Sequence, residues 1–200
     1  MNFLAHLYLS GDDEKIITGN FIGDYVKGKD FLKYPEPVRK GIILHRQIDS
    51  FTDSHPVFRE IRKLFRSDFA LYSGVVTDLI LDHFLASHWE MYSHESLRKF
   101  ARRIHAVLLS NFTYLPLRVQ GFLPILIQNR RLESYARPEG IHQSLDIMSR
   151  YTSLPPKANI AIAVMNENFN SIQKHFFIFM KDLIAFAENE SGILINKPPL

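Results

Sequence analysis

The chain has 200 residues, a formal net charge of +3 at pH 7 and no cysteine. This length suffices for one domain with a substantial core, and the missing thiols exclude disulfide bonds, zinc–thiolate sites and cysteine nucleophiles. The small net charge does not call for nucleic acid as a partner, and we expect none. Apolar residues recur at helical spacing almost throughout, so we expect an all-α protein.

In chain order, the pattern predicts a short helix over 2–9, a helix over 14–27, and a longer one that begins near Pro37 and carries His45. His55-Pro56 should end that helix. The helices expected after this break cover 57–66, a segment capped by Ser73, a segment over 94–109 capped by Ser93, 111–128, 138–151 and 156–188.

No alternating strand pattern, internal repeat or linker-like segment divides the chain. We therefore predict a single multi-helix bundle domain over residues 1–190, followed by an irregular tail over 191–200. The first residues, MNFLAHLYLSGDDEK, lack the basic start of a signal peptide. No apolar run approaches the ~20 residues that span a bilayer, so we expect a cytoplasmic protein without a membrane partner.

The most informative pattern is a pair of helix faces on which acids and histidines share the apolar stripe. His45, Asp49 and Asp53 follow one another at four-residue steps in GIILHRQIDSFTD, and Asp78 and Asp82 do so in VVTDLILDHFLASHW. Four residues are about one helical turn, so each set projects from one side of its helix. Burying unpaired carboxylates is costly, and the two faces therefore indicate a cation between helices.

Histidine and carboxylate side chains suit a divalent ion, and the excess of carboxylates favours Mn2+, with Mg2+, Fe2+ or Co2+ as alternatives. His6, in the apolar first helix, is a candidate general acid or additional ligand. Arg46 is a candidate phosphate contact, because a guanidinium offers two parallel donors. The candidate metal ligands are Asp24, His45, Asp49, Asp78, Asp82 and His83.

Each candidate also has an ordinary structural interpretation. His6 could be a hydrogen-bonded core histidine. Asp24 could pair with a lysine or arginine, and Asp49 with Arg46. Asp78 and Asp82 could lie on a solvated face. The joint pattern on two helices favours the metal site over these separate explanations.

In its motifs the chain resembles the acyl carrier protein phosphodiesterases, also called holo-acyl-carrier-protein hydrolases. The resemblance rests on Asn2-Phe-Leu-Ala-His6, Gly19-Asn20 with Asp24, His45-Arg46-x-Ile-Asp49-x-x-Thr52-Asp53 and Asp82-His83-Phe-Leu-x-x-His88-Trp89, all within the first ninety residues. It implies a helical fold distantly similar to the HD-type phosphohydrolases. The chain lacks the His-Asp dipeptide of that superfamily and has the reversed order, so its ligand assignments do not carry over.

The resemblance also implies metal-dependent hydrolysis of the phosphodiester that joins 4′-phosphopantetheine to a serine of acyl carrier protein, an acidic protein. The alternatives are a metal-dependent phosphohydrolase of a small nucleotide and a non-enzymatic helical binding module. An acidic partner could be steered by basic side chains. Four basic clusters are available: Arg39-Lys40, Arg62-Lys63 with Arg66, Arg98-Lys99 with Arg102-Arg103, and Arg130-Arg131.

Overall fold

The computed structural model describes residues 2–195 and 197–198, and within them every regular element is helical, as the sequence predicts. The helices before residue 90 are α1 (Phe3–Tyr8), α2 (Glu14–Phe21), η1 (Gly23–Tyr25), η2 (Asp30–Lys33), α3 (Glu36–Ser54), α4 (Pro56–Phe69), η3 (Ala70–Tyr72), α5 (Ser73–Ser87) and η4 (Trp89–Met91). The remaining helices are α6 (Leu97–Ser110), η5 (Phe112–Tyr114), α7 (Leu117–Gln128), α8 (Arg131–Ser134), α9 (Pro138–Tyr151), α10 (Ala158–Glu167) and α11 (Phe169–Ser191).

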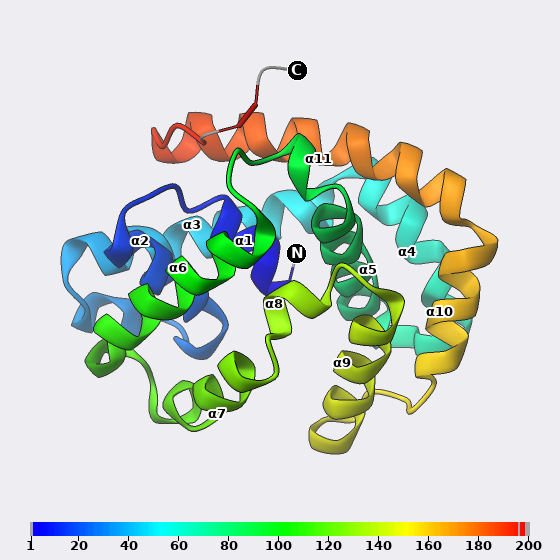
Figure 1. Cartoon of the computed structure of the whole chain (residues 1–200), viewed down its shortest axis with the longest axis horizontal. Coiled ribbons are helices and arrows are strands. Elements are labelled where there is room, and N and C mark those ends of the chain that lie inside the picture. Colours follow the sequence, from blue (N-terminus) through cyan, green and yellow to red (C-terminus); the bar gives the residue numbers. More distant parts are fainter. Residues whose placement is uncertain (1, 196, 199–200) are drawn as a thin grey trace.

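The short helix α1 lies near the middle of the molecule, and the longer helices pack around it (Figure 1). α2 packs along α3, and both contact α1 or the elements beside it, while α4 packs along α5. The long helix α11 runs across α3, α4 and α5. α6 and α7 lie on one side of the view and α9 and α10 on the other (Figure 1).

Two glycines let α2 and α3 approach each other closely. A Cβ atom on Gly19 would overlap the carbonyl oxygen of Val38, and one on Gly41 would overlap that of Ile16. Any other residue would force the helices apart, because neither obstacle is a flexible side chain. This contact brings the residues after Gly19 and Gly41 within reach of one another, and it therefore sets the geometry of the site described below.

The start of α1 is fixed from two directions. Asn2 Oδ1 accepts a hydrogen bond from the backbone N–H of Phe3 at 2.8 Å, which is an N-cap interaction. Asp82, on α5, accepts the backbone N–H groups of Leu4 at 2.8 Å and Ala5 at 3.2 Å. The first N–H groups of a helix have no hydrogen-bond partner inside that helix. In α1, which is buried in the core, a carboxylate from another helix accepts two of these N–H groups.

Some predicted boundaries were wrong, for local reasons. The helix predicted over 14–27 ends at Phe21 and continues as η1, and the one predicted over 156–188 is divided at Asn168, whose amide donates to Val164 O. Ser73 does not cap α5, because its hydroxyl donates to Ala70 O. α6 begins three residues later than predicted and is capped by Ser96 instead of Ser93.

By length and composition, one helical stretch over Pro56–Ser87 could cross a membrane. The apolar pattern of the sequence did not predict such a stretch. It comprises α4, η3 and α5, and 67% of its apolar window is buried inside the fold. Burial of this kind is typical of a core helix that packs against its neighbours. The apolarity of the stretch is therefore explained by contacts within the protein.

Candidate metal centre

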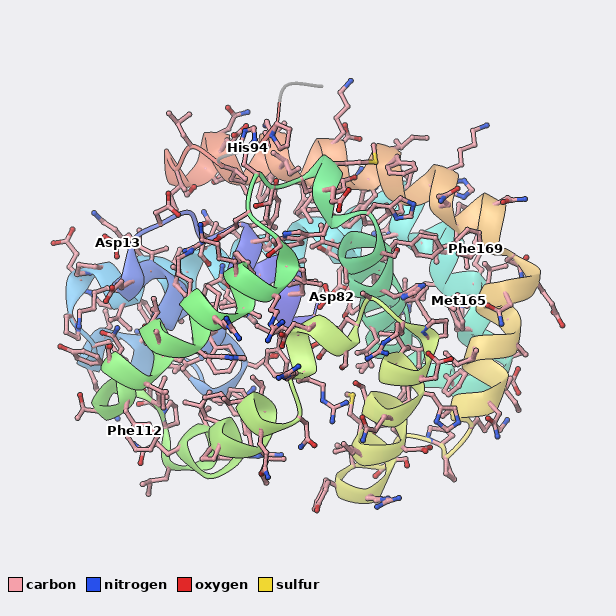
Figure 2. All side chains as sticks on the ribbon, viewed as in Figure 1. Asp13, Asp82, His94, Phe112, Met165 and Phe169 are labelled. Carbon is pink, nitrogen blue, oxygen red and sulfur yellow. The ribbon has the colours of Figure 1, made fainter. Side chains whose placement is uncertain are left out.

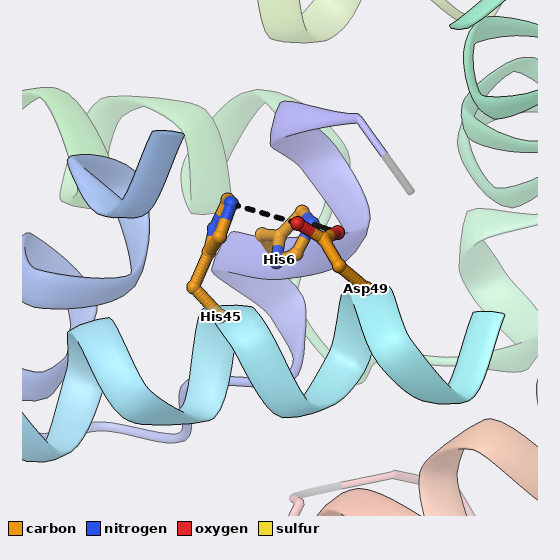
Figure 3. Close-up of side chains that lie close together, drawn as sticks. All are labelled: His6, His45 and Asp49. Atoms are coloured by element: carbon orange, nitrogen blue, oxygen red, sulfur yellow. Dashed lines mark hydrogen bonds and ion pairs between the residues drawn. The ribbon is translucent and has the colours of Figure 1, made fainter. Parts of the chain in front are cut away.

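His6, His45 and Asp49 converge where α1 crosses α3 (Figure 3). His6 Nε2 lies 3.1 Å from Asp49 Oδ1, and His45 Nε2 lies 3.2 Å from Asp49 Oδ2. The imidazole rings of His6 and His45 stack with their centroids 4.0 Å apart. His45 and Asp49 are one turn apart on α3, as the sequence pattern predicts, while His6 enters from α1.

A single buried amide orients both imidazoles. Asn20, on α2, donates its Nδ2 hydrogen to His6 O at 2.9 Å, which fixes the direction of its side chain. Its Oδ1 then faces His6 Nδ1 at 2.9 Å and His45 Nδ1 at 3.2 Å. An amide oxygen only accepts hydrogen bonds, so both Nδ1 atoms must carry hydrogen. In the neutral tautomers this leaves the Nε2 lone pairs of both rings directed at Asp49.

The charge states of these three side chains depend on one another. Burial and the neighbouring His45 lower the pKa of His6 to about 4, so its ring is neutral at pH 7. Burial opposes the charge of His45, but the carboxylates of Asp24 and Asp49 raise its pKa to about 9. Burial opposes ionisation of Asp49 as well, yet the two imidazoles hold its pKa well below the usual range. One proton on His45 therefore leaves the lone pair of His6 facing a carboxylate oxygen.

The donor set fits a divalent cation. Its three ligand atoms lie within 4.8 Å of one another. Two nitrogen or oxygen ligands of one ion, each about 2.1 Å from it, are separated by roughly 3.0–3.4 Å, and the N–O distances here are 3.1 and 3.2 Å. His45 Nε2 is buried and makes no hydrogen bond of normal geometry within the described chain. The three side chains therefore form a candidate metal-binding site.

Asp24, on η1, supplies a second carboxylate and a fourth side chain. Its Oδ1 lies 3.4 Å from His45 Nε2, and the interaction with His45 lowers its pKa. Gly23 permits this approach, because a Cβ atom there would overlap the ring of His45. The imidazoles are buried, whereas the side chain of Asp49 is 41% exposed and that of Asp24 is 68% exposed. The centre is therefore anchored in the core and open to solvent on its carboxylate side.

Asp82 and Asp78, the α5 candidates, lie behind this cluster. Asp82 is fully buried near the middle of the molecule (Figure 2) and accepts the backbone N–H groups of the two residues directly before His6. Burial raises its pKa to about 7 against the effect of those N–H groups. Burial also raises the pKa of Asp78, and the charges of Asp49 and Asp53 add to the effect. Among the described residues, the side chains whose donor atoms converge include neither Asp78 nor Asp82.

His83 and Arg46 have other contacts. His83 Nδ1 donates to Tyr135 O at 2.8 Å, on the side of α5 that faces the segment after α8. Arg46 Nη2 donates to Val26 O at 2.9 Å and Gly28 O at 3.0 Å, and its guanidinium lies over the ring of Phe31. The structure thus brings Asp24, His45 and Asp49 together with His6, and it does not bring His83 into that group. Arg46 secures the loop that follows Asp24.

Asn20 was not predicted to be a functional residue, although it lies in the Gly19-Asn20 motif. A signal was present, because Asn20 falls on the same apolar helix face as Ile16 and Ile17. A buried amide on such a face needs polar partners. Without the positions of α1 and α3, nothing in the pattern indicates that both partners are imidazoles.

Known proteins resemble this chain over most of its length. The sequence profile described as acyl carrier protein phosphodiesterase matches residues 1–183, far beyond the first ninety residues in which the motifs lie. The acyl carrier protein phosphodiesterase of Yersinia pestis is 32% identical over 177 residues, which cover 88% of each chain. That of Pectobacterium atrosepticum is 31% identical over 180 residues, 90% of each chain. That of an Enterobacter species is 29% identical over 191 residues, 95% of this chain and 99% of the relative.

No solved structure matches the chain, so its similarity to the HD-type phosphohydrolases stays a prediction. The family is shown by the profile and by relatives that match over most of both chains. The chain belongs to the acyl carrier protein phosphodiesterase family.

Proposed function

We propose that the protein is a metal-dependent phosphodiesterase that hydrolyses the bond between 4′-phosphopantetheine and a serine of holo-acyl carrier protein, which yields the apo protein. The family supports the substrate. The observation that carries the metal dependence is the convergence of two imidazole Nε2 atoms, with their tautomers fixed by Asn20, on the carboxylate of Asp49.

The residues that would hold the ion are His6, His45, Asp49 and Asp24. The mixture of imidazole and carboxylate, with carboxylates exposed to solvent, favours Mn2+, and Mg2+, Fe2+ or Co2+ remain the alternatives. A bound divalent ion polarises a phosphate oxygen and makes a water molecule acidic enough to supply hydroxide near neutral pH. Asn20 holds both imidazoles in the tautomer that presents the Nε2 lone pair, so the ligands are oriented before any ion binds.

The anionic phosphodiester must approach from the solvent side, where Asp24 and Asp49 are exposed. Without a cation the two carboxylates would repel the phosphodiester. We therefore expect only the metal-bound protein to accept the substrate. The leaving group is the serine alkoxide of the carrier protein. His6, which burial holds neutral, fits the role of ligand better than that of acid, so the alkoxide takes its proton from the solvent to which the carboxylate side of the centre is open.

The test is conversion of holo-acyl carrier protein to the apo form, followed by the mass of the intact carrier protein. The wild type with Mn2+ should release 4′-phosphopantetheine, and both Asp49→Asn and His45→Gln should lose at least a hundredfold in kcat/KM. A matched control exists on α9, where His142 and Asp146 form another pair four residues apart at 3.3 Å on the surface. Asp146→Asn should behave as the wild type.

Two results would contradict the proposal. Full turnover by Asp49→Asn would show that the cluster is not the reaction centre. Failure of the Mn2+-loaded wild type to act on holo-acyl carrier protein, with turnover of a nucleotide or cyclic nucleotide in the same panel, would move the protein to the small-nucleotide alternative.

A further inference from the structure

The surface beside the metal centre is formed by the loop 25–34 and by α7. Tyr25 directly follows Asp24, whose Oδ1 lies 3.4 Å from His45 Nε2. The ring of Tyr25 meets that of Phe122, on α7, at a centroid distance of 5.6 Å, and the guanidinium of Arg118 lies 5.9 Å from the Tyr25 ring. The start of α7 therefore borders the open side of the centre.

This surface is basic. The only charged residue of α7 is Arg118, and the loop 25–34 contains three lysines and one acidic residue, Asp30, which pairs with Lys33. Arg118 on α7 is exposed, and Lys27 and Lys29 are exposed on the loop. Within the described chain these three cations form no ion pair with a carboxylate. They present uncompensated positive charge next to the site, which attracts an acidic partner.

The same surface offers apolar contact and a hollow. Leu117 is 85% exposed and Ile125 is 56% exposed on the outer face of α7, and a side chain at Gly121 between them would meet nothing within 4 Å. Apolar side chains beside a basic rim are typical of a protein interface. Between the loop and the start of α7 lies a cavity of about 250 Å³, lined by Tyr25, Val26, Asp30, Lys33, Tyr34 and Pro116.

The basic cluster nearest to the candidate ligands in sequence, Arg62 to Arg66, lies elsewhere. It belongs to α4, which packs with α5, α10 and α11, away from α7 in the view of Figure 1. Arg62 also donates a hydrogen bond to the hydroxyl of Ser73 at 3.0 Å, so one of the three basic side chains in this cluster is held by a contact within the fold. Proximity in sequence is therefore a poor guide to the docking surface.

We propose that the face formed by Lys27, Lys29, Arg118 and the outer side of α7 receives the acidic carrier protein, with the prosthetic arm passing along the cavity beside Tyr25. This inference rests on the proposed function. The three cations steer and orient the carrier so that its phosphodiester reaches the exposed carboxylate side of the centre. The apolar side chains Leu117 and Ile125 then contribute contact area.

The test compares two charge reversals of equal size in the full-length, Mn2+-loaded protein. One variant combines Lys27→Glu, Lys29→Glu and Arg118→Glu, and the matched control combines Arg62→Glu, Lys63→Glu and Arg66→Glu. The first should raise KM for holo-acyl carrier protein about tenfold or more with kcat nearly unchanged, and should flatten the dependence of KM on salt. The control should keep the wild-type KM, and both variants should bind Mn2+ with wild-type affinity in calorimetry.

The outcomes separate the two proposals. If the wild type acts on holo-acyl carrier protein and the first variant keeps its KM, the docking surface is wrong while the function stands. A rise in KM for the Arg62 to Arg66 reversal alone would place the carrier on α4 and overturn the inference. If the wild type binds Mn2+ but neither binds nor hydrolyses holo-acyl carrier protein, the proposed function itself has failed.

Discussion

At the scale of single residues, one amide determines how two imidazoles face the centre. Asn20 accepts hydrogen bonds from both Nδ1 atoms and donates to the backbone of His6. Outer partners of this kind commonly change metal affinity by 10–100-fold when they are removed. Asn20 is therefore as much a part of the centre as the side chains that would contact the ion.

We expect Asn20→Ala to weaken Mn2+ binding by about ten- to a hundredfold, measured by isothermal titration calorimetry, because both rings lose the acceptor that fixes their tautomer. Asn111→Ala is the matched control, since Asn111 is also a buried amide, which donates to Val107 O far along the chain from the ligands. It should lower stability and keep the affinity. Equal Mn2+ affinity of Asn20→Ala and the wild type would contradict this role.

Asp82 provides a second residue-level prediction, because its carboxylate binds the backbone of α1. Asp82→Ala leaves the buried N–H groups of Leu4 and Ala5 without their acceptor, which should cost about 1–3 kcal/mol in the free energy of unfolding. His6 should shift with the helix, so Mn2+ affinity should also fall. Asp82→Asn keeps one acceptor oxygen and should restore part of both properties.

The two Asp82 variants distinguish positioning from direct ligation. Thermal melting and calorimetry on the same samples give stability and Mn2+ affinity together. If Asp82 were a ligand of the ion, Asp82→Asn would lose Mn2+ affinity as fully as Asp82→Ala even though its melting temperature is partly restored.

The raised pKa of His45 predicts a pH dependence of the metal-free protein. This pKa is about 9, above the ordinary value of 6.5, so folding is favoured while the ring is protonated. The stabilisation is complete below pH 6.5 and is lost as the pH rises through 9. After chelation, the melting temperature of the wild type should therefore fall more between pH 6.5 and 9.5 than that of His45→Gln. Parallel curves for the two proteins would contradict the assignment.

At the scale of elements, the α2–α3 contact sets the spacing of the centre. Gly41→Ala would place a methyl group against the carbonyl oxygen of Ile16, and the helices would have to separate. Such overpacking typically costs about 1–3 kcal/mol. The separation would also move Asn20 away from His45, so both the melting temperature and Mn2+ affinity should fall.

Gly121→Ala, in the interior of α7, is the natural control for this substitution. A Cβ atom there meets nothing within 4 Å, and alanine favours a helix over glycine by about 1 kcal/mol. The control should therefore be neutral or slightly stabilised. A melting temperature of Gly41→Ala at or above the wild-type value would show that the two helices do not require this close approach.

Helical periodicity predicted most helices and the two site residues that α3 contributes. His45 and Asp49 share a face of α3, as expected, and α9 has the predicted bounds of Pro138–Tyr151. Asp82 and His83 are neighbours, so they project about 100° apart on α5 and contact different parts of the fold. The contributions of His6 and Asn20 depend on where α1 and α2 pack against α3. The spacing of residues along the sequence gives no information about this packing.

At the scale of the whole molecule, the centre joins parts that are far apart in sequence. α1 supplies His6, α2 supplies Asn20, η1 supplies Asp24, and α3 supplies His45 and Asp49, while α5 holds α1 in place through Asp82. α7, from the second half of the chain, borders the open side through Phe122 and Arg118. In the docking face proposed above, α7 from the second half therefore adjoins Lys27 and Lys29 from the first half, which also supplies the residues of the centre.

The most direct measurement is anomalous scattering from crystals of the wild type grown with Mn2+, recorded near the manganese absorption edge. We expect one strong peak between His6 Nε2, His45 Nε2 and the Asp49 carboxylate, with Asp24 on its solvent side. We also expect the peak to disappear in Asp49→Asn crystals grown in the same way. A peak beside Asp82 and His83 instead, or none at saturating Mn2+, would contradict the central claim that these three residues form the metal centre.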